Sequence, residues 1–162
     1  MKKIVFLILL STVIFSCTTT RTVTTKSGES IEVNTNNVYF RDDFTKVSDQ
    51  TKADFLSKHK ANSDAYSMLI LTSGYKGEIV KVNSTSSKIY EGTTYTVKSN
   101  GIAGYMRVKN SDDILITDDY TKQTALISAD HLKKYKFVYV LKDNANKKQP
   151  YKITFSNSLR PL

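Results

Sequence analysis

Two stretches near the end of the chain decide its fold class: Tyr135-Lys136-Phe137-Val138-Tyr139-Val140-Leu141-Lys142 and Tyr151-Lys152-Ile153-Thr154-Phe155. In both, a large apolar residue recurs at every second position. Because successive side chains of a strand point to opposite faces, this spacing predicts two β-strands. Joined through residues 143–150, they form a hairpin whose inner face is predicted to carry Tyr135, Phe137, Tyr139, Leu141, Tyr151, Ile153 and Phe155. The outer face is predicted to carry Lys136, Lys142, Lys152 and Thr154.

The segments before this hairpin predict further short strands. Tyr66–Thr72 is apolar on both faces, which is typical of a central strand. Glu91-Gly92 is predicted to form the turn of a hairpin between residues 88–90 and 93–98. The other strands are expected at residues 29–34, 38–40, 78–83, 102–109, 114–117 and 124–128.

One helix is predicted at residues 48–60, where Ser48 can cap the N-terminus and Asp49 lies in the first turn. Its apolar face is thin, consisting of Ala53, Phe55 and Leu56, so it should pack on the sheet while partly exposed. Residues 128–134 add one or two helical turns. Many short strands with a single helix predict a mainly β, single-domain β-sandwich, immunoglobulin-like or transthyretin-like. A small β-barrel is the alternative.

The N-terminal residues have a different pattern. Lys2 and Lys3 precede an apolar run from Ile4 to Phe15 that is broken only by Ser11-Thr12. A membrane-spanning helix needs about 20 apolar residues, and this run is shorter. A charged start followed by a short apolar core predicts a secretory signal.

The run ends in Ile14-Phe15-Ser16-Cys17, which resembles the lipobox of bacterial lipoprotein precursors. The resemblance implies that the sulfur of Cys17, the only cysteine, receives a diacylglyceryl group. It also implies that signal peptidase II cuts between Ser16 and Cys17 and that the new amino group is then open to acylation. Two or three acyl chains anchor a protein stably, whereas one binds only marginally. Apart from these covalent acyl chains, no cofactor is expected.

These features divide the chain into three parts. Residues 1–16 are predicted to be a signal peptide, and residues 17–28 the lipidated cysteine with a flexible, threonine-rich tether. Residues 29–162 form the β-rich globular domain. Thr18 stands where enteric lipoproteins of the inner membrane have aspartate, so the resemblance implies the periplasmic face of the outer membrane.

Charge is unevenly distributed along the domain. Residues 29–130 contain 12 basic and 14 acidic residues, whereas residues 131–162 contain 8 basic residues and one acidic residue. This basic C-terminal part could contact lipid headgroups or an acidic partner, or it could be a solvated surface. The candidate contact residues are Lys133, Lys134, Lys147, Lys148 and Lys152. Nucleic acid is disfavoured as a partner because the signal exports the protein.

The sequence gives little support for a catalytic site or a metal site. The two histidines, His59 and His131, have no matched nucleophile, and no hydrolase, zincin or phosphate-loop motif is present. We therefore predict that the chain is not an enzyme. The pairs Asp112-Asp113 and Asp118-Asp119 could supply oxygens to calcium. They are instead interpreted as solvated turn carboxylates, and no metal site is predicted.

The function predicted from these features is that of a lipid-anchored, non-catalytic envelope lipoprotein. It would act as an interaction or accessory module for an envelope protein that the sequence does not identify. One alternative is a lipocalin-like carrier, which needs an apolar cavity of ~300 Å³ or more. The other is an inhibitor or immunity-type periplasmic protein.

Overall fold

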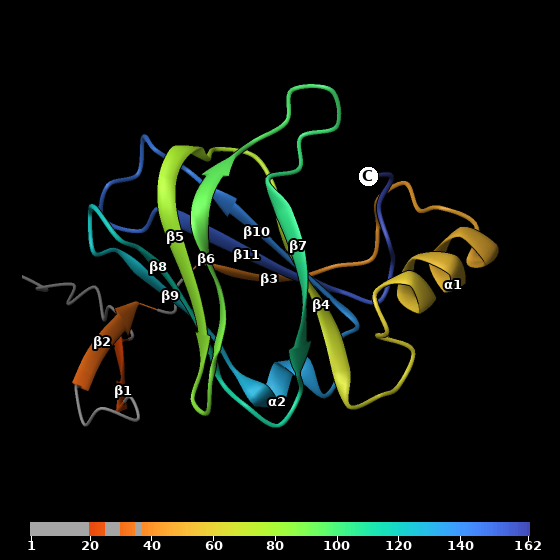
Figure 1. Cartoon of the computed structure of the whole chain (residues 1–162), viewed down its shortest axis with the longest axis horizontal. Coiled ribbons are helices and arrows are strands. Elements are labelled where there is room, and N and C mark those ends of the chain that lie inside the picture. Colours follow the sequence, from red (N-terminus) through yellow and green to blue (C-terminus); the bar gives the residue numbers. More distant parts are fainter. Residues whose placement is uncertain (1–19, 25–29, 35–36) are drawn as a thin grey trace, which may run out of the picture.

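The computed structural model describes residues 20–24, 30–34 and 37–162 and is mainly β (Figure 1). Two larger sheets lie face to face. The five-stranded sheet has the order β3-β11-β10-β4-β7 and the four-stranded sheet the order β6-β5-β8-β9, while β1 and β2 form a separate pair. The strands are β1 Thr20–Thr24, β2 Ser30–Asn34, β3 Val38–Phe40, β4 Tyr66–Leu71, β5 Lys76–Ser84, β6 Lys88–Tyr95, β7 Gly104–Lys109, β8 Ile114–Asp118, β9 Thr124–Ile127, β10 Phe137–Lys142 and β11 Tyr151–Ser156, and the helices are α1 Asp49–Lys58 and α2 Ala129–Leu132.

This arrangement is consistent with the predicted β-sandwich. The alternative of a small barrel is wrong, because the two sheets of the described chain share no strand and do not close on each other. No helix within residues 20–24, 30–34 and 37–162 has both the length and the apolar character needed to cross a bilayer.

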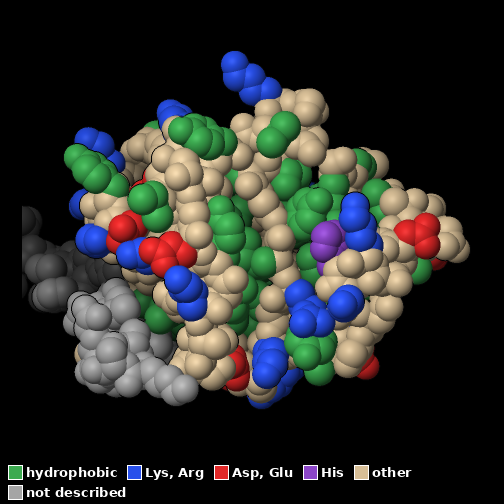
Figure 2. Space-filling model, viewed as in Figure 1, with side chains coloured by type: hydrophobic (Ala, Val, Ile, Leu, Met, Phe, Trp, Pro, Cys, Tyr) green, Lys and Arg blue, Asp and Glu red, His purple; other side chains and the backbone are tan. Residues whose placement is uncertain are grey.

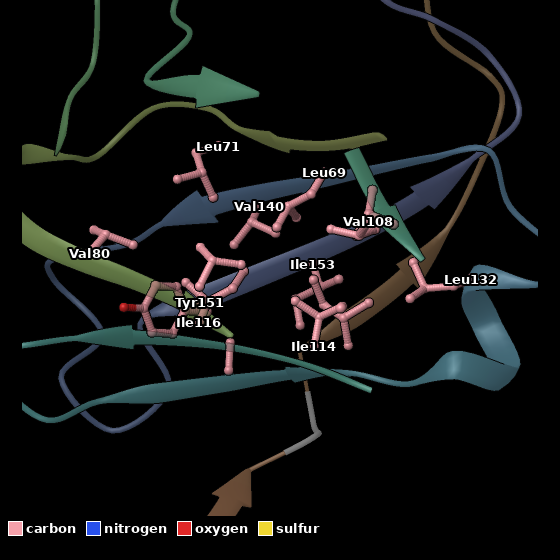
Figure 3. Packing of buried hydrophobic residues seen from close by; sticks show 14 of the residues in the cluster. Leu69, Leu71, Val80, Val108, Ile114, Ile116, Leu132, Val140, Tyr151 and Ile153 are labelled. Atoms are coloured by element: carbon pink, nitrogen blue, oxygen red, sulfur yellow. The ribbon is translucent and has the colours of Figure 1, made fainter. Parts of the chain in front are cut away.

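The space between the two sheets is filled by apolar side chains (Figure 3). Leu69, Leu71 and Val140 from the five-stranded sheet meet Val80 and Ile116 from the four-stranded sheet, and all five are fully buried. Burying a side chain of this size contributes about 1.5–3 kcal/mol. The interior of the sandwich is therefore a packed core.

A second apolar layer covers the other face of the five-stranded sheet. Helix α1 begins after Ser48, whose Oγ accepts a hydrogen bond from the Thr51 amide at 3.1 Å, as predicted. Leu56 of α1 packs on this face together with Leu159 near the C-terminus. The sheet residues beneath them are Met68, Ile70, Phe137 and Tyr139, all buried.

The β10–β11 hairpin is confirmed, and so is the predicted inner face of β11, because Tyr151, Ile153 and Phe155 lie in the core between the sheets. The predicted distribution of side chains is wrong for β10. Val138 opposes Phe155 and Val140 opposes Ile153, and these residues face the other sheet. Phe137 and Tyr139 point to the opposite side, towards α1. Because both faces of β10 are buried, the aromatic residues at every second position mark the outer apolar layer and not the inter-sheet core. By the same alternation, Lys142 lies on the inner face.

Two other local predictions differ from the structure. β6 runs without a break through Glu91-Gly92, where Gly92 pairs with Val80. A Cβ on Gly92 would lie 2.9 Å from the Tyr90 hydroxyl, so the glycine makes room for that side chain and does not form a turn. In addition, Thr20–Thr24 forms strand β1 inside the segment predicted to be a flexible tether.

Strand β1 pairs along its length with β2. Threonine favours strands, and the backbone pairing needs no apolar side chains. Val33 of β2 is buried with Leu115 and Leu126, so the β1–β2 hairpin packs on β8 and β9. Cys17 and the rest of the predicted tether lie outside the described residues.

Candidate functional site

A groove lies at the surface where β4 begins and β7 ends. The antiparallel pairing of these strands places Tyr66 opposite Lys109. A pocket of about 320 Å³ there is lined by Asp64, Ala65, Tyr66, Lys109, Asn110, Ser111 and Lys133. A second pocket of about 150 Å³ shares Tyr66 and Lys109 with the first and is also lined by Ser84, Ser87, Ile89, Arg107 and Asp112. Together they are called the basic groove.

Asn110 holds the walls of the groove together. The backbone amide of Asn110 donates to the Ala65 carbonyl at 2.9 Å, and the side-chain Nδ2 donates to the Asp64 carbonyl at 2.7 Å. These bonds join the turn after β7 to the loop before β4. The Oδ1 atom of Asn110 is buried and has no hydrogen-bond partner among the described residues. An unpaired buried acceptor is unusual in a folded protein.

The cations of β7 point out of the sandwich because they alternate with the inward-facing Met106 and Val108. The Arg107 guanidinium carbon lies 4.3 Å from the centre of the Tyr66 ring. Its Nη1 donates to the Lys60 carbonyl at 3.0 Å. Figure 2 shows several Lys and Arg side chains gathered around these ends of β4 and β7.

Two further lysines approach the groove from the segment around α2. Lys133 follows α2 directly. The Ser67 hydroxyl of β4 donates to the Leu132 carbonyl at 3.1 Å and so holds this segment against the sheet. Lys136 donates through Nζ to the carbonyls of Ser63 and Tyr66, at 2.8 and 2.9 Å. Burial lowers the pKa of Lys136.

Two cations of the groove, Arg107 and Lys109, form no ion pair among the described residues, unlike two lysines of the four-stranded sheet. On that sheet Lys81 pairs with Asp119 at 2.7 Å, and Lys88 pairs with Glu91 at 3.0 Å. In the described part of the chain, Arg107 and Lys109 have no acidic group within 4.0 Å. Lys133 reaches only Asp130, at 3.8 Å, and both side chains are largely exposed. The groove therefore carries two cations without an ion-pair partner, although Asp64 and Asp112 also line it.

The five lysines predicted as contact residues do not form one surface. Lys133 lines the basic groove, and Lys134 follows it. Lys147 and Lys148 lie in the loop between β10 and β11, at the end of β10 that is opposite to Lys133 and Lys134. Lys152 lies on β11, with its Nζ 4.5 Å from the centre of the Tyr39 ring. Arg107 and Lys109 were not among the predicted contact residues, because they lie outside the C-terminal charge excess of residues 131–162. Their outward positions on an alternating strand were the available signal.

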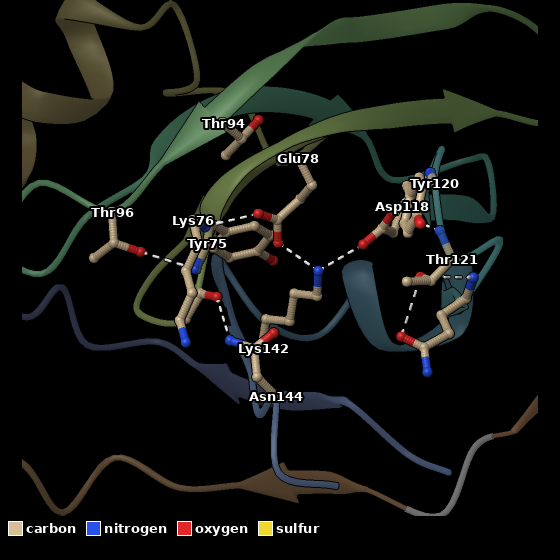
Figure 4. A network of polar contacts seen from close by, with 12 residues as sticks. Tyr75, Lys76, Glu78, Thr94, Thr96, Asp118, Tyr120, Thr121, Lys142 and Asn144 are labelled. Atoms are coloured by element: carbon tan, nitrogen blue, oxygen red, sulfur yellow. Dashed lines mark hydrogen bonds and ion pairs between the residues drawn. The ribbon is translucent and has the colours of Figure 1, made fainter. Parts of the chain in front are cut away.

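A second polar cluster is enclosed between the sheets (Figure 4). Lys142 of β10 is 7% exposed, and its Nζ donates to Glu78 of β5 and to Asp118 of β8, the latter at 2.6 Å. Asp118 in turn accepts the backbone amides of Tyr120 and Thr121 through Oδ1. The cluster joins three strands of the two sheets.

The protonation states of this cluster follow from its hydrogen bonds. Burial by itself would raise the pKa of Glu78 and of Asp118, but the hydrogen bonds from Lys142 and from backbone amides, together with the charge of Lys142, outweigh it and lower both pKa values. For Lys142, burial acts to lower the pKa, and the two carboxylates reverse this and raise it. All three groups are therefore charged at neutral pH. Since Lys142 is paired with both carboxylates and the three side chains are largely shielded from solvent, we assign the cluster a structural role.

This finding corrects two sequence interpretations. Lys142 was predicted on the outer face of the hairpin and instead points into the sandwich. Asp118 was interpreted as a solvated turn carboxylate, yet it is 1% exposed. The other acidic residues are also engaged: Asp119 pairs with Lys81 and Lys122, and Asp112 accepts hydrogen bonds from Ser86 and Ser111.

Comparisons with family models, curated proteins and solved structures find no match to this chain. Its function therefore has to be argued from its own residues.

Other chemistry-bearing groups are dispersed. His59 lies against Phe55 and Tyr105, with ring centres 4.7 Å apart in both cases, whereas His131 of α2 lies beside Phe40 and Phe155. Within the described ranges, no three His, Cys, Asp or Glu side chains come together in a way that could hold a metal ion.

The buried cluster predicts a loss of stability in acid. Glu78 and Asp118 have lowered pKa values in the folded state, against ordinary values of 4.5 and 3.8. Their contribution is therefore complete above about pH 4.5–5 and is lost as the pH falls through the folded-state pKa values. We expect urea unfolding at pH 7, 5, 4 and 3 to show this decline. In the uncharged variant Lys142→Met/Glu78→Gln/Asp118→Asn, the decline should be smaller. Equal declines in both proteins would contradict the prediction.

Proposed function

We propose that this chain is a lipid-anchored, non-catalytic protein of a bacterial envelope whose folded domain acts by binding another envelope protein. The observation that carries the proposal is the position of the only cysteine, Cys17, which directly follows a secretory leader and Ser16. The proposed location is the periplasmic face of the outer membrane. Acylation of Cys17 would supply the anchor.

The fold is compatible with anchoring close to the bilayer. Strand β1 begins at Thr20, three residues after Cys17. Three residues span at most ~11 Å, so the β1–β2 hairpin would lie close to the lipid surface. Helix α1 and the strands β4 and β7, whose ends carry the basic groove, lie away from this hairpin (Figure 1). They would be accessible to a protein in the periplasm.

The packed interior favours contact over transport. A lipocalin-like carrier encloses its ligand in an apolar cavity, whereas here the space between the sheets is filled by side chains that are at most 5% exposed. The 320 Å³ pocket lies at the surface and carries charged residues, among them Lys109 and Lys133. An inhibitor or immunity-type protein also acts through its surface and is one form of the proposed function.

The anchor is tested by replacing Cys17 with serine in the full chain expressed in a bacterium. We expect the parent protein to incorporate radioactive palmitate and to fractionate with membranes. The variant Cys17→Ser should incorporate no label and accumulate with its leader attached, because serine lacks the sulfur that is acylated. Ser16→Ala keeps a small residue at the cleavage site and serves as the matched control, with labelling unchanged. Mass spectrometry showing a bare thiol on the mature protein would refute the anchor.

A further inference from the structure

The basic groove combines three properties that suggest a specific ligand. It is concave, it contains an aromatic ring, and two of its cations, Arg107 and Lys109, form no ion pair among the described residues. Tyr66 and Lys109 line both pockets, so the two form one continuous surface. Asp64 and Asp112 also line it, and the Asp112 carboxylate accepts hydrogen bonds from Ser86 and Ser111 but keeps its negative charge. Arg107 and Lys109 have no acidic group within 4.0 Å among the described residues.

The groove is also held in shape before any ligand binds. Asn110 links its two walls through the carbonyls of Asp64 and Ala65. Arg107 is fixed between the Tyr66 ring and the Lys60 carbonyl, which holds its charge at one place. Preorganisation of this kind reduces the entropy lost on binding.

We propose that the basic groove binds an acidic, extended segment of a partner protein. Carboxylate side chains of such a segment would pair with Arg107, Lys109 and Lys133, and the segment would lie against Tyr66. In an extended chain, side chains on one face recur at about 6.5–7 Å, so two adjoining pockets accommodate more than one of them. The inference rests on the proposed function, since it names the chemistry of the partner.

An anionic membrane is the less suitable ligand for this surface. A bilayer is broad and flat, whereas the groove is concave and carries its cations around a pocket. The strands that carry the groove, β4 and β7, also lie away from the β1–β2 hairpin, which begins three residues after Cys17 in the sequence. Charged residues also protect exposed edge strands from pairing with other chains. Protection of the edge strand β7 requires no ligand, so the binding experiment below distinguishes it from the proposed recognition of an acidic segment.

The test measures fluorescence anisotropy of a fluorescein-labelled peptide of glutamates around a central tyrosine, added to the full acylated chain in detergent at low salt. We expect saturable binding that the double variant Arg107→Glu/Lys109→Glu weakens about tenfold or more. Lys147→Glu/Lys148→Glu makes the same change in net charge at the opposite end of the hairpin. It should alter binding by less than about twofold. Raising salt to about 0.15 M, where the Debye length is ~8 Å, should weaken binding to the parent protein.

The outcomes separate the alternatives. Absence of peptide binding at low salt, or equal weakening by the two double variants, overturns the proposal. Vesicles of phosphatidylcholine with phosphatidylglycerol form the second arm, and loss of vesicle binding with unchanged peptide binding in Arg107→Glu/Lys109→Glu also overturns it. Circular dichroism checks the fold of each variant, and Lys109→Gln/Lys133→Gln replaces the reversal if that protein does not fold. Peptide binding without acylation of Cys17 would refute the anchor alone, and acylation without peptide binding would refute this inference alone.

Discussion

Replacing Lys142 with methionine is expected to lower the free energy of unfolding by about 3–5 kcal/mol, because removing one partner of a buried ion pair leaves an uncompensated charge. Here two carboxylates would lose their cation. Glu78 and Asp118 both bind Lys142, and Asp118 is 1% exposed. Methionine has nearly the volume of lysine, so the loss would come from charge rather than from a cavity. Urea denaturation at pH 7 gives the measurement.

The triple variant Lys142→Met/Glu78→Gln/Asp118→Asn distinguishes the charge effect from a packing effect. It removes all three charges but keeps oxygen acceptors for the amides of Lys76, Tyr120 and Thr121, which the two carboxylates now bind. We expect it to recover most of the lost stability, since neutral groups cost much less to bury than an unpaired charge. Lys147→Met, in the exposed β10–β11 loop, is the control and should change stability by less than about 0.5 kcal/mol. A loss below about 1 kcal/mol in Lys142→Met would contradict the structural role.

Replacing Phe137 with alanine is expected to cost about 3–5 kcal/mol of folding stability. The side chain is fully buried on the outer face of the five-stranded sheet, where it contributes to the layer under α1. Its ring lies 6.4 Å from that of Phe55 in α1, and the Lys52 Nζ lies 5.7 Å from its centre. The truncation would remove apolar contacts and leave a cavity that the rigid sheet cannot close.

The packing of α1 over Phe137 can be tested separately from overall stability. Because α1 packs over this ring, hydrogen exchange in residues 49–58 should rise in Phe137→Ala more than exchange in the four-stranded sheet. Tyr120→Ala, which truncates a side chain that is 91% exposed, is the matched aromatic control and should change stability by less than about 0.5 kcal/mol. Unchanged thermal unfolding of Phe137→Ala would show that the ring is not part of a packed layer.

The element order could be predicted well because each strand carries its own local signal. Helix α1 was anticipated from Ser48 and Asp49, and the β10–β11 hairpin from its alternating residues. The errors arose at positions whose role depends on distant neighbours. Gly92 suggested a turn, but it lies inside β6 and makes room for Tyr90. The threonines of β1 suggested a tether, but they pair with β2.

The candidate groove was anticipated in only one residue, Lys133. The charge excess of the C-terminal residues was real, yet strand β10 separates Lys133 and Lys134 at one of its ends from Lys147 and Lys148 at the other. Arg107, Lys109 and Tyr66 come together because β4 and β7 pair in antiparallel fashion, with Tyr66 opposite Lys109. No short-range pattern contains that pairing, since the two strands are separated by two others in the chain.

The amino-acid sequence by itself determined that this chain forms short strands, where the single helix of any length lies, and which residues alternate along each strand. Only the tertiary structure decided what covers each face of β10: α1 on one side and the four-stranded sheet on the other. That is why Phe137 and Val138 are both buried, and why Lys142 lies inside the sandwich with two carboxylates. The physical reason is that alternation is a local property of the backbone, whereas burial and charge pairing depend on segments brought together by the fold.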